Sequence, residues 1–384
     1  MKKNSRLMVS RKARTERGKI RKVGAKQDVT IGVDLGDLSS SYCVLDGGGQ
    51  VCSRGQVLTT KTGVTKFFQK LKPCVVVMEA GTHSGWVSRL VASYGHEVIV
   101  ANPRAVKLIS KGKRKSDRVD AEMLARLGRA DRTLLWPIQH RGEEAQRDLA
   151  VIRARATLVE ARTALVSSAR GLVKSLGERL KRGDASGVNE SWAEGLSEEV
   201  KQAVEPLLKS VGAINGQVKE YDQKIEGMGV RYPEMQLLKQ VHGVGTLTAL
   251  AYVLTIEDAR RFRRSRDVGA YVGLVPARKE SGESQPELSI SKAGDKLLRT
   301  LLVQGAHCIL RKGGAESDLR EWGLKKQQGG KRAKRRAIVG VARRLAVLLH
   351  HLWVSGEVYE PLYNRNRAEE AARKAAQKAA QKAA

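Results

Sequence analysis

The sequence predicts an α/β domain with a mixed sheet near its N-terminal end, followed by mainly helical segments. Two apolar, strand-like runs occur within residues 31–45, and more of them follow up to residue 100 with helix-like segments between. From residue 143 onward, apolar residues recur instead at spacings of three and four, the period of a helix. Strands that alternate with helices are typical of a sheet with parallel strands, so the two patterns predict this fold class.

The first predicted unit covers residues 28–140 and begins with an antiparallel meander. Its strands are expected at 31–36, 39–45 and 50–58, with a glycine turn at 47–49. The remaining elements alternate between helix and strand: helices at 62–71 and 86–94, strands at 73–79 and 97–100, and closing helices at 104–110 and 117–127. This order places the ends of two strands and the start of the last helix at one end of the sheet.

A helical coiled-coil arm is predicted for residues 141–231. Apolar residues recur from Leu149 to Leu180, a second periodic run covers 196–225, and a polar break at 181–187 separates them. The arm has two open roles. Spacing and oligomerisation is one; the other is a cradle for nucleic acid, because Arg153, Arg162 and Arg170 lie on its polar face.

The third predicted unit, residues 232–365, is mainly α. A Gly-Val-Gly turn at 243–245 between two short helices predicts a helix-hairpin-helix-like element, whose backbone N–H groups suit a phosphate. A polar loop at 273–284, a helix opening within 288–299 and an apolar helix at 338–353 follow. Two stretches are strongly basic, 260–264 and 326–336. An Ala/Lys-rich tail at 366–384 is expected to be frayed helix or disordered.

The charge of the chain indicates a polyanionic partner. Lysine and arginine number 71 against 40 acidic residues, which gives a formal net charge of +31 and a pI near 10.2. We expect no membrane-spanning segment, and DNA or RNA is favoured over a membrane surface. The basic residues selected as nucleic-acid contacts are Arg104, Lys107, Lys113, Arg114, Arg118, Arg153, Arg162, Arg170, Arg263 and Lys292.

The N-terminal residues and the spacing of the cysteines indicate in which cellular compartment the protein is expected. Residues 1–27 are basic and lack an apolar core, so a disordered arm that lies on phosphates is expected, not a secretory signal. The four cysteines show no C-x-x-C spacing, which favours a reducing cytoplasm and no zinc site. A cytoplasmic, nucleoid-associated protein is the expectation.

Four carboxylates occur at positions that suit metal chemistry. Asp34 and Glu79 each end an apolar strand, and Asp117 and Asp120 lie three positions apart at a helix start, where they share a face. The helical pair has several explanations: a bound divalent cation, neutralisation by Arg114, Lys115 and Arg118, or complementation of the helix dipole. Taken with the strand-end acids, the set suits two Mg²⁺ or Mn²⁺ ions in phosphoryl displacement.

Several motifs in this order resemble the DEDD transposases of bacterial insertion sequences, relatives of the pilin-gene invertases that act as bridge-RNA-guided recombinases. The first half carries Gly-Val-Asp, Met-Glu-Ala-Gly-Thr-His, Asn-Pro-Arg-Ala-Val-Lys and Lys-Ser-Asp-Arg-Val-Asp-Ala. The second half carries Gly-Val-Gly, Arg-Arg-Phe, Tyr-x-Gly-Leu-x-Pro and Ser-Lys-x-Gly-Asp-x-x-Leu-Arg. The resemblance covers about residues 29–352 and implies a RuvC-like (RNase H-like) N-terminal domain.

The resemblance also implies a site and its partners. Asp34, Glu79, Asp117 and Asp120 would form the acidic tetrad that holds Mg²⁺, and Ser281 would be the nucleophile that forms a phosphoserine link to DNA. Ser284 and Ser289 are rivals, because the loop departs from the family's Ser-Ser-Gly-Gly pattern. The implied partners are donor and target DNA, a guide RNA, and further copies in a homodimer or homotetramer.

Two other functions remain open from the sequence. One is a metal-dependent, junction-resolving nuclease in which water is the nucleophile, and the other is a non-catalytic nucleic-acid-binding factor. Serine in a glycine-containing loop is a turn residue by default. Only the serine mechanism leaves a covalent protein–DNA adduct, so the adduct separates these functions.

Overall fold

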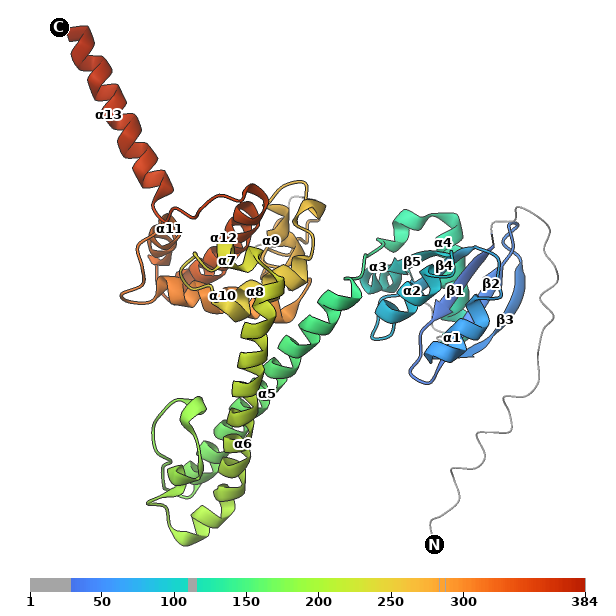
Figure 1. The fold of residues 1–384 in the computed structure, drawn as a ribbon, viewed down its shortest axis with the longest axis horizontal. Helices are drawn as coiled ribbons and strands as arrows, with labels where there is room; N and C mark the ends of the chain where they lie inside the picture. The colour runs from blue at the N-terminus through green and yellow to red at the C-terminus, as the bar shows by residue number, and fades with distance from the viewer. Residues whose placement is uncertain (1–28, 110–115, 283, 287, 384) are drawn as a thin grey trace. The chain divides into compact units, whose positions relative to one another are not determined.

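The computed structural model describes residues 29–109, 116–282, 284–286 and 288–383 (Figure 1). The chain divides into two compact units, Met1–Arg141 and Gly142–Ala384, and each is described here by itself. The predicted basic arm at 1–27 lies outside the described residues, as do the predicted contacts Lys113 and Arg114.

The first unit contains one mixed sheet, which confirms the predicted α/β class. The sheet has five strands in the order β3-β2-β1-β4-β5; β1 pairs antiparallel with β2 and parallel with β4. β2 and β3 form the expected antiparallel meander, and β4 pairs parallel with β5. The elements are β1 (Thr30–Asp34), β2 (Ser39–Leu45), β3 (Val51–Leu58), α1 (Lys61–Phe68), β4 (Val75–Glu79), α2 (Ser84–Ala92), β5 (Glu97–Ala101), α3 (Pro103–Ile109), α4 (Asp117–Ala130) and the 3-10 turn η1 (Arg132–Leu135).

Helices cover both faces of this sheet, which explains why β1 and β4 are apolar up to the acidic residue that ends each of them. Ile31 and Met78 pack with Phe68 of α1 and Val91 of α2 on one face. On the other face, Val77 packs with Leu124 of α4. Central strands covered on both sides need near-continuous apolar sequence, and these two strands have it.

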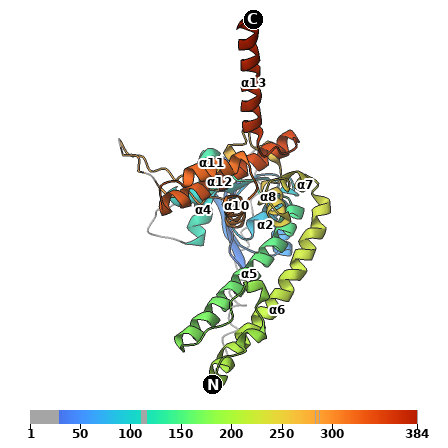
Figure 2. The ribbon, with the colours of Figure 1, turned by 90° about the vertical axis from the view of Figure 1, so that its left-hand side faces the viewer.

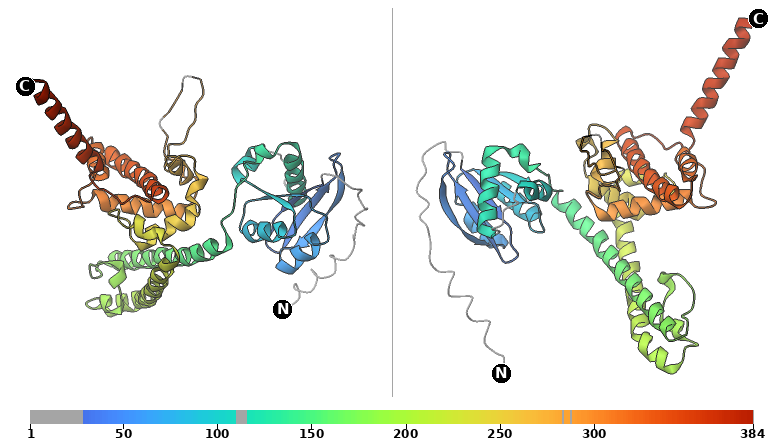
Figure 3. Two further views of the ribbon diagram at one scale, coloured as in Figure 1. Left: turned by 45° about the horizontal axis from the view of Figure 1, so that its top comes forward. Right: turned by 180° about the vertical axis from the view of Figure 1, so that it is seen from behind.

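Gly32 in β1 allows α4 to lie directly on the sheet. A Cβ atom at this position would come within 2.0 Å of the carbonyl oxygen of Ala121 and 2.5 Å of the amide nitrogen of Ala125. Both atoms belong to the helix backbone and cannot move aside as a flexible side chain can. The right-hand view of Figure 3 shows α4 lying across the strands.

The second unit is helical. Its elements are α5 (Glu143–Ser175), η2 (Ala185–Gly187), η3 (Glu190–Ala193), α6 (Glu198–Met228), η4 (Gly229–Arg231), α7 (Glu234–Leu238), α8 (Thr246–Ile256), η5 (Ala259–Arg261), α9 (Asp267–Tyr271), α10 (Lys296–Leu310), α11 (Asp318–Gln327), α12 (Lys331–Ser355) and α13 (Tyr363–Ala383). The mainly helical C-terminal part predicted from the sequence is therefore confirmed.

Helices α5 and α6 form an antiparallel hairpin and run side by side in Figure 2. Arg155 pairs with Asp222 and Arg162 with Asn215, so residue numbers rise on one helix as they fall on the other. The first helix was expected to continue to Leu180, but it ends at Ser175, because the chain turns at Gly177 with a φ of 85°. Leu180 instead packs with Trp192 in a separate apolar core at the tip.

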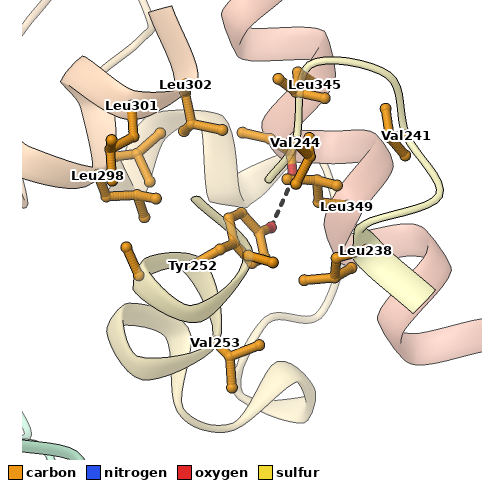
Figure 4. Packing of buried hydrophobic residues seen from close by; sticks show 14 of the residues in the cluster. Leu238, Val241, Val244, Tyr252, Val253, Leu298, Leu301, Leu302, Leu345 and Leu349 are labelled. Carbon is orange, nitrogen blue, oxygen red and sulfur yellow. Dashed lines mark hydrogen bonds between the residues drawn. The ribbon is translucent and has the colours of Figure 1, made fainter. Parts of the chain in front are cut away.

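The core of the C-terminal part surrounds α8, which is buried on every side (Figure 4). Tyr252 is fully buried there, and its hydroxyl donates to the carbonyl oxygen of Ala346 on α12 at 2.7 Å. Burial raises the pKa of Tyr252, so its hydroxyl remains a donor. Gly243 lies against α10, since a Cβ there would approach the carbonyl oxygen of Gly305 to 2.7 Å. The Gly-x-Gly turn thus serves helix packing.

The helix predicted to open within 288–299 is confirmed, since α10 begins at Lys296 with Asp295 as its cap. The residues before it are extended, because Ile290 pairs with Pro276 in a β-bridge. No spanning segment was predicted, and among the described residues α12 alone is long and apolar enough to cross a membrane by length and composition. Val341 and Leu345 in this helix are fully buried in the core, and a core helix passes the same test.

Replacing Gly32 by alanine is expected to destabilise the first unit. The added methyl group must displace the α4 backbone, and overpacking of this kind costs about 3 kcal/mol. Denaturant unfolding of the full chain tests this, with Gly171→Ala as the control, because a Cβ at Gly171 in α5 meets no atom within 4 Å. Equal unfolding midpoints for the two variants would contradict the predicted contact.

Candidate active site

Two of the four carboxylates predicted to bind metal lie at the ends of neighbouring strands. Asp34 ends β1 and Glu79 ends β4, and these strands pair in parallel with Val33 opposite Met78. Both acidic residues are half-buried, while Val33 and Met78 just before them are buried in the core. Parallel strands end at the same sheet edge, so the pairing brings Asp34 and Glu79 to one edge.

The direction of α4 brings the other two carboxylates to the same edge. Near the C-terminal end of α4, Arg126 and Arg129 donate to the carbonyl oxygens of Gly49 and Gly47 in the β2–β3 turn. That turn lies beside the beginning of β1, because Leu45 pairs with Thr30. The N-terminal end of α4 therefore points toward the end of β1, with Asp117 and Asp120 in its first turn.

The four carboxylates share an edge but are not drawn into one cluster. Asp117 is exposed and Asp120 is half-buried. Among the described residues, no three His, Cys, Asp or Glu side chains stand close enough to hold a metal ion. Carboxylates repel one another at neutral pH, and a divalent cation is the group that would bring them together. In donor chemistry and in position at one edge, Asp34, Glu79, Asp117 and Asp120 fit such an ion.

Basic side chains surround this edge. α3 begins directly after β5, at the edge where Glu79 pairs with Ala101, and Arg104 and Lys107 are exposed on it. Arg118 is exposed in the first turn of α4. These three selected contacts therefore lie where a phosphate backbone approaching the acidic edge would meet them.

The loops that follow β1 and β4 contain two residues that the sequence did not single out. His83 receives a hydrogen bond at Nδ1 from Nε1–H of Trp86 at 3.1 Å, and its Nε2 lies 3.5 Å from a carboxylate oxygen of Asp37. Because indole is only a donor, this geometry leaves the ring proton on Nε2, facing Asp37. In the sequence, His83 is only the last residue of the Met-Glu-Ala-Gly-Thr-His motif, and nothing in its position indicates a contact with Asp37.

His140 was also missed, and it fixes the start of α2. Its Nε2 lies 2.9 Å from the hydroxyl of Ser84, which is fully buried and also bonds the backbone of Gly81. Burial lowers the pKa of His140, and the charges of Arg89 and Arg141 lower it further. The interaction connects the end of the first unit to the loop that follows Glu79.

The candidate serine lies at the tip of a hairpin in the second unit. Ser281 and Ser284 exchange backbone hydrogen bonds of 3.2 and 3.0 Å, and Gly282 between them has a φ of 56°. Both serines and Ser289 are exposed. The left-hand view of Figure 3 shows this hairpin standing out from its unit. An exposed hydroxyl at a turn is accessible to a large substrate.

The base of this hairpin is tightly packed, in contrast to its tip. Gly273 and Gly294 both have a φ of 73°, and a Cβ on either would approach a backbone oxygen to 2.2 Å or less. Arg299 donates to the carbonyl oxygens of Val272 and Ala293. Lys292, a selected contact, is exposed at this base with a φ of 52°. The serines therefore project from a fixed support.

The arginines selected on the helical hairpin make internal contacts. Arg153 pairs with Asp295 at 2.8 Å, which connects α5 to the cap of α10. Arg162 donates to Asn215 on α6, and Arg170 donates to the carbonyl oxygen of Gly183 beside Trp192. Arg263, in contrast, is exposed near α9. Helical periodicity identified the polar face but could not show which arginines the fold itself uses.

Comparison with known proteins identifies the family. A family model described as a transposase of the DEDD type of IS110 matches residues 31–177, and one described as "Transposase IS116/IS110/IS902 family" matches residues 235–320. A probable family 20 transposase of Pseudomonas aeruginosa is 32% identical over 295 residues, covering 73% of this chain and 84% of the relative. The chain belongs to the IS116/IS110/IS902 family of transposases.

Other relatives of this transposase agree. The transposase for insertion sequence element IS1111A of Coxiella burnetii is 29% identical over 358 residues, 92% of this chain and 97% of the relative. The pilin gene-inverting protein of Moraxella bovis is 23% identical over 71% of this chain and 78% of its own length. The protein is thus an enzyme of DNA transposition or recombination, and its DEDD domain implies use of a divalent metal.

Acidification is expected to loosen the start of α2 in the transposase. Because the pKa of His140 is lowered in the fold, the unfolded state binds the proton first as pH falls below about 6.5. The stabilisation is present above that pH and is lost as pH falls through the folded pKa. The ratio of the observed to the intrinsic amide exchange rate in α2 should therefore be constant above about pH 6.5 and rise as the pH falls below it.

Glutamine at position 140 retains hydrogen-bonding groups without titrating, so His140→Gln should flatten this pH response. His307→Gln is the control, because His307 is exposed on α10. An unchanged response in His140→Gln would assign the effect to another group.

Proposed function

We propose that this transposase cuts and rejoins donor and target DNA through a phosphoserine intermediate formed by Ser281. Two features of the fold carry the proposal. They are the four carboxylates at one sheet edge and the exposed serine hairpin on its rigid base. The family supplies the reaction class, DNA cleavage and rejoining.

In the proposed step, Oγ of Ser281 attacks the phosphorus of the scissile phosphodiester. The Oγ–P bond forms as the bond to one deoxyribose oxygen breaks, and the proton lost from the serine hydroxyl balances the proton gained by the leaving oxygen. The link keeps one phosphodiester bond for each bond broken, so attack by a new DNA hydroxyl reverses the step and rejoins the strands.

The acidic edge would assist this chemistry. Mg²⁺ or Mn²⁺ held by Asp34, Glu79, Asp117 and Asp120 would act as a Lewis acid that stabilises charge on the phosphate. Arg104, Lys107 and Arg118 would hold the neighbouring phosphates, with Arg263 and Lys292 in the same role in the second unit. Arg153, Arg162 and Arg170 would contribute mainly by shaping the helical hairpin, given their internal partners.

We also propose that the acidic edge and the serine come from different subunits of a homodimer or homotetramer. Its support is the division of the chain, since the carboxylates lie in the first unit and the serine in the second. A guide RNA would select the DNA by base pairing while the protein contacts backbone and shape. The net charge of +31 and the family resemblance support that part of the proposal, in the cytoplasm with nucleoid DNA as substrate.

A covalent adduct is the expected product. The purified transposase, the non-coding RNA of its element, end-labelled donor and target DNA and Mg²⁺ are incubated and resolved on a denaturing gel. Ser281→Ala and Asp117→Ala should each reduce the protease-sensitive adduct by at least about a hundredfold. Ser284→Ala is the matched control, because Ser284 shares the exposed turn and should leave the adduct intact.

Two other outcomes would overturn the assignment. Adduct that survives Ser281→Ala but not Ser284→Ala would move the nucleophile to the rival serine. Cleavage without any adduct, surviving both serine variants but not Asp117→Ala, would indicate a junction-resolving nuclease that uses water.

A further inference from the structure

One strongly basic stretch has no role in the site described above. Between Glu321 and Glu357 the sequence contains no acidic residue, while its lysines and arginines are Lys325, Lys326, Lys331, Arg332, Lys334, Arg335, Arg336, Arg343 and Arg344. Lys325 pairs with Glu321 on α11. The remaining charges belong to the end of α11 and to α12, and of these Arg343 and Arg344 line a pocket together with Glu321 and Glu357.

Part of this charge lies on the side of α12 that faces away from the core. Apolar residues such as Val341, Leu345 and Leu349 are fully buried in the core. Arg332, Arg343 and Arg344 are exposed. We call the exposed side, defined by Arg332, Arg336, Arg343 and Arg344, the α12 basic face. A helix that buries its apolar face and exposes an acid-free one presents that charge to a partner.

Trp322 holds one arginine of this face in position. The indole of Trp322 lies against Gly340, where a Cβ would approach its ring to 2.8 Å. The guanidinium carbon of Arg344 stacks on the same ring, 4.0 Å from its centroid. Stacking restricts the long side chain, so less conformational entropy is lost when its N–H groups bind an anion. The glycine is required because a side chain there would displace the tryptophan.

A pocket opens where α11 meets α12. It has a volume of about 470 Å³, and its charged lining residues are Lys326, Arg332 and Arg336, with Trp322 as its aromatic wall. Cationic side chains around an aromatic ring form a surface that suits a sugar-phosphate backbone.

The face continues onto the arginine loop before α9. The stem of Arg343 packs on Gly269 of α9, where a Cβ would meet it at 3.1 Å. His350 of α12 is buried and fixes the loop, since its ring nitrogens lie 2.9 Å from the hydroxyl of Ser265 and 2.8 Å from the carbonyl oxygen of Ala259. Arg263 and Arg266 are exposed on this loop, so the positive surface extends over two elements.

We infer that the α12 basic face is a second nucleic-acid-binding surface, which holds phosphodiester backbone through residues outside the serine hairpin. The inference rests on one part of the proposed function, that the partner is DNA or RNA. It does not depend on which residue is the nucleophile. A membrane surface is the competing polyanion. It is disfavoured because the apolar face of α12, which would have to enter the lipid, is buried in the core.

Salt dependence of binding tests the inference. Arg332→Gln/Arg343→Gln/Arg344→Gln removes three charges, and each lost phosphate contact should lower the slope of log affinity against log salt by about 0.9 on duplex DNA and about 0.7 on single strands. Full-chain protein is titrated with labelled duplex DNA and with single-stranded RNA of matched length. The substrate with the larger loss is the one this face prefers. A fall of about two to three in slope, uniform across sequences, is expected.

A triple variant with the same charge change is the control. Lys209, Lys219 and Lys239 are exposed elsewhere in the second unit, so replacing them by glutamine should leave the slope near that of the wild type.

The stacking of Arg344 is tested at Trp322. Trp322→Leu should weaken nucleic-acid binding, and Trp322→Phe should keep most of it, because only phenylalanine retains a ring for Arg344. Circular dichroism confirms that each variant is folded.

Three results would overturn the inference. The first is an equal salt slope for the two triple variants. The second is binding of the wild type to anionic phospholipid vesicles that only the arginine triple variant loses, while its nucleic-acid binding persists. The third is an equal loss of nucleic-acid binding in the two tryptophan variants. Failure of the serine mechanism gives a different pattern, since Ser281→Ala abolishes the adduct and leaves the salt slope unchanged.

Discussion

The contact between Gly32 and the backbone of α4 is the constraint on which the acidic edge depends. It lets the helix lie against the sheet at a distance that no side chain at position 32 would allow. Leu45 pairs with Thr30 and Arg129 bonds the nearby turn, so the helix direction is also fixed. Strand pairing brings Asp34 and Glu79 to one edge, and this packing brings Asp117 and Asp120 of α4 to the same edge, although β1, β4 and α4 are far apart in the sequence.

The serine hairpin follows the opposite principle. Its base is fixed by the close backbone contacts of Gly273 and Gly294 and by Arg299, while Ser281 and Ser284 near its tip are exposed and bond each other's backbone. Rigid support with an accessible tip suits a nucleophile that must enter a DNA backbone. The α12 basic face has a similar design, in which a buried apolar side and a stacked tryptophan orient exposed charge.

Much of the first unit could be predicted from the sequence, because period and strand order carry direct physical information. The apolar runs before Asp34 and Glu79 identified both strands and their ends, and the mixed sheet followed from their order. What could not be predicted depends on contacts distant in sequence. Examples are His140 bonding Ser84, Arg153 pairing with Asp295, and Gly177 ending α5 before Leu180.

Composition likewise identified a polyanion binder but could not locate its surfaces. The sequence places all arginines of the helical hairpin on its polar face without distinguishing them. The fold shows that Arg162 and Arg170 form hydrogen bonds within the hairpin. The apolar segment of α12 is similar, since length and composition describe a possible membrane span while packing shows a core helix.

The central claim is that the acidic edge of one subunit acts with the serine hairpin of another. Mixing Asp117→Ala and Ser281→Ala protein, with a mass tag on the former, tests it most directly. The account predicts that adduct returns in the mixture and migrates with the tagged chain, which alone retains Ser281. Adduct that stays absent, although the mass tag shows that the two variants form mixed oligomers, would contradict it.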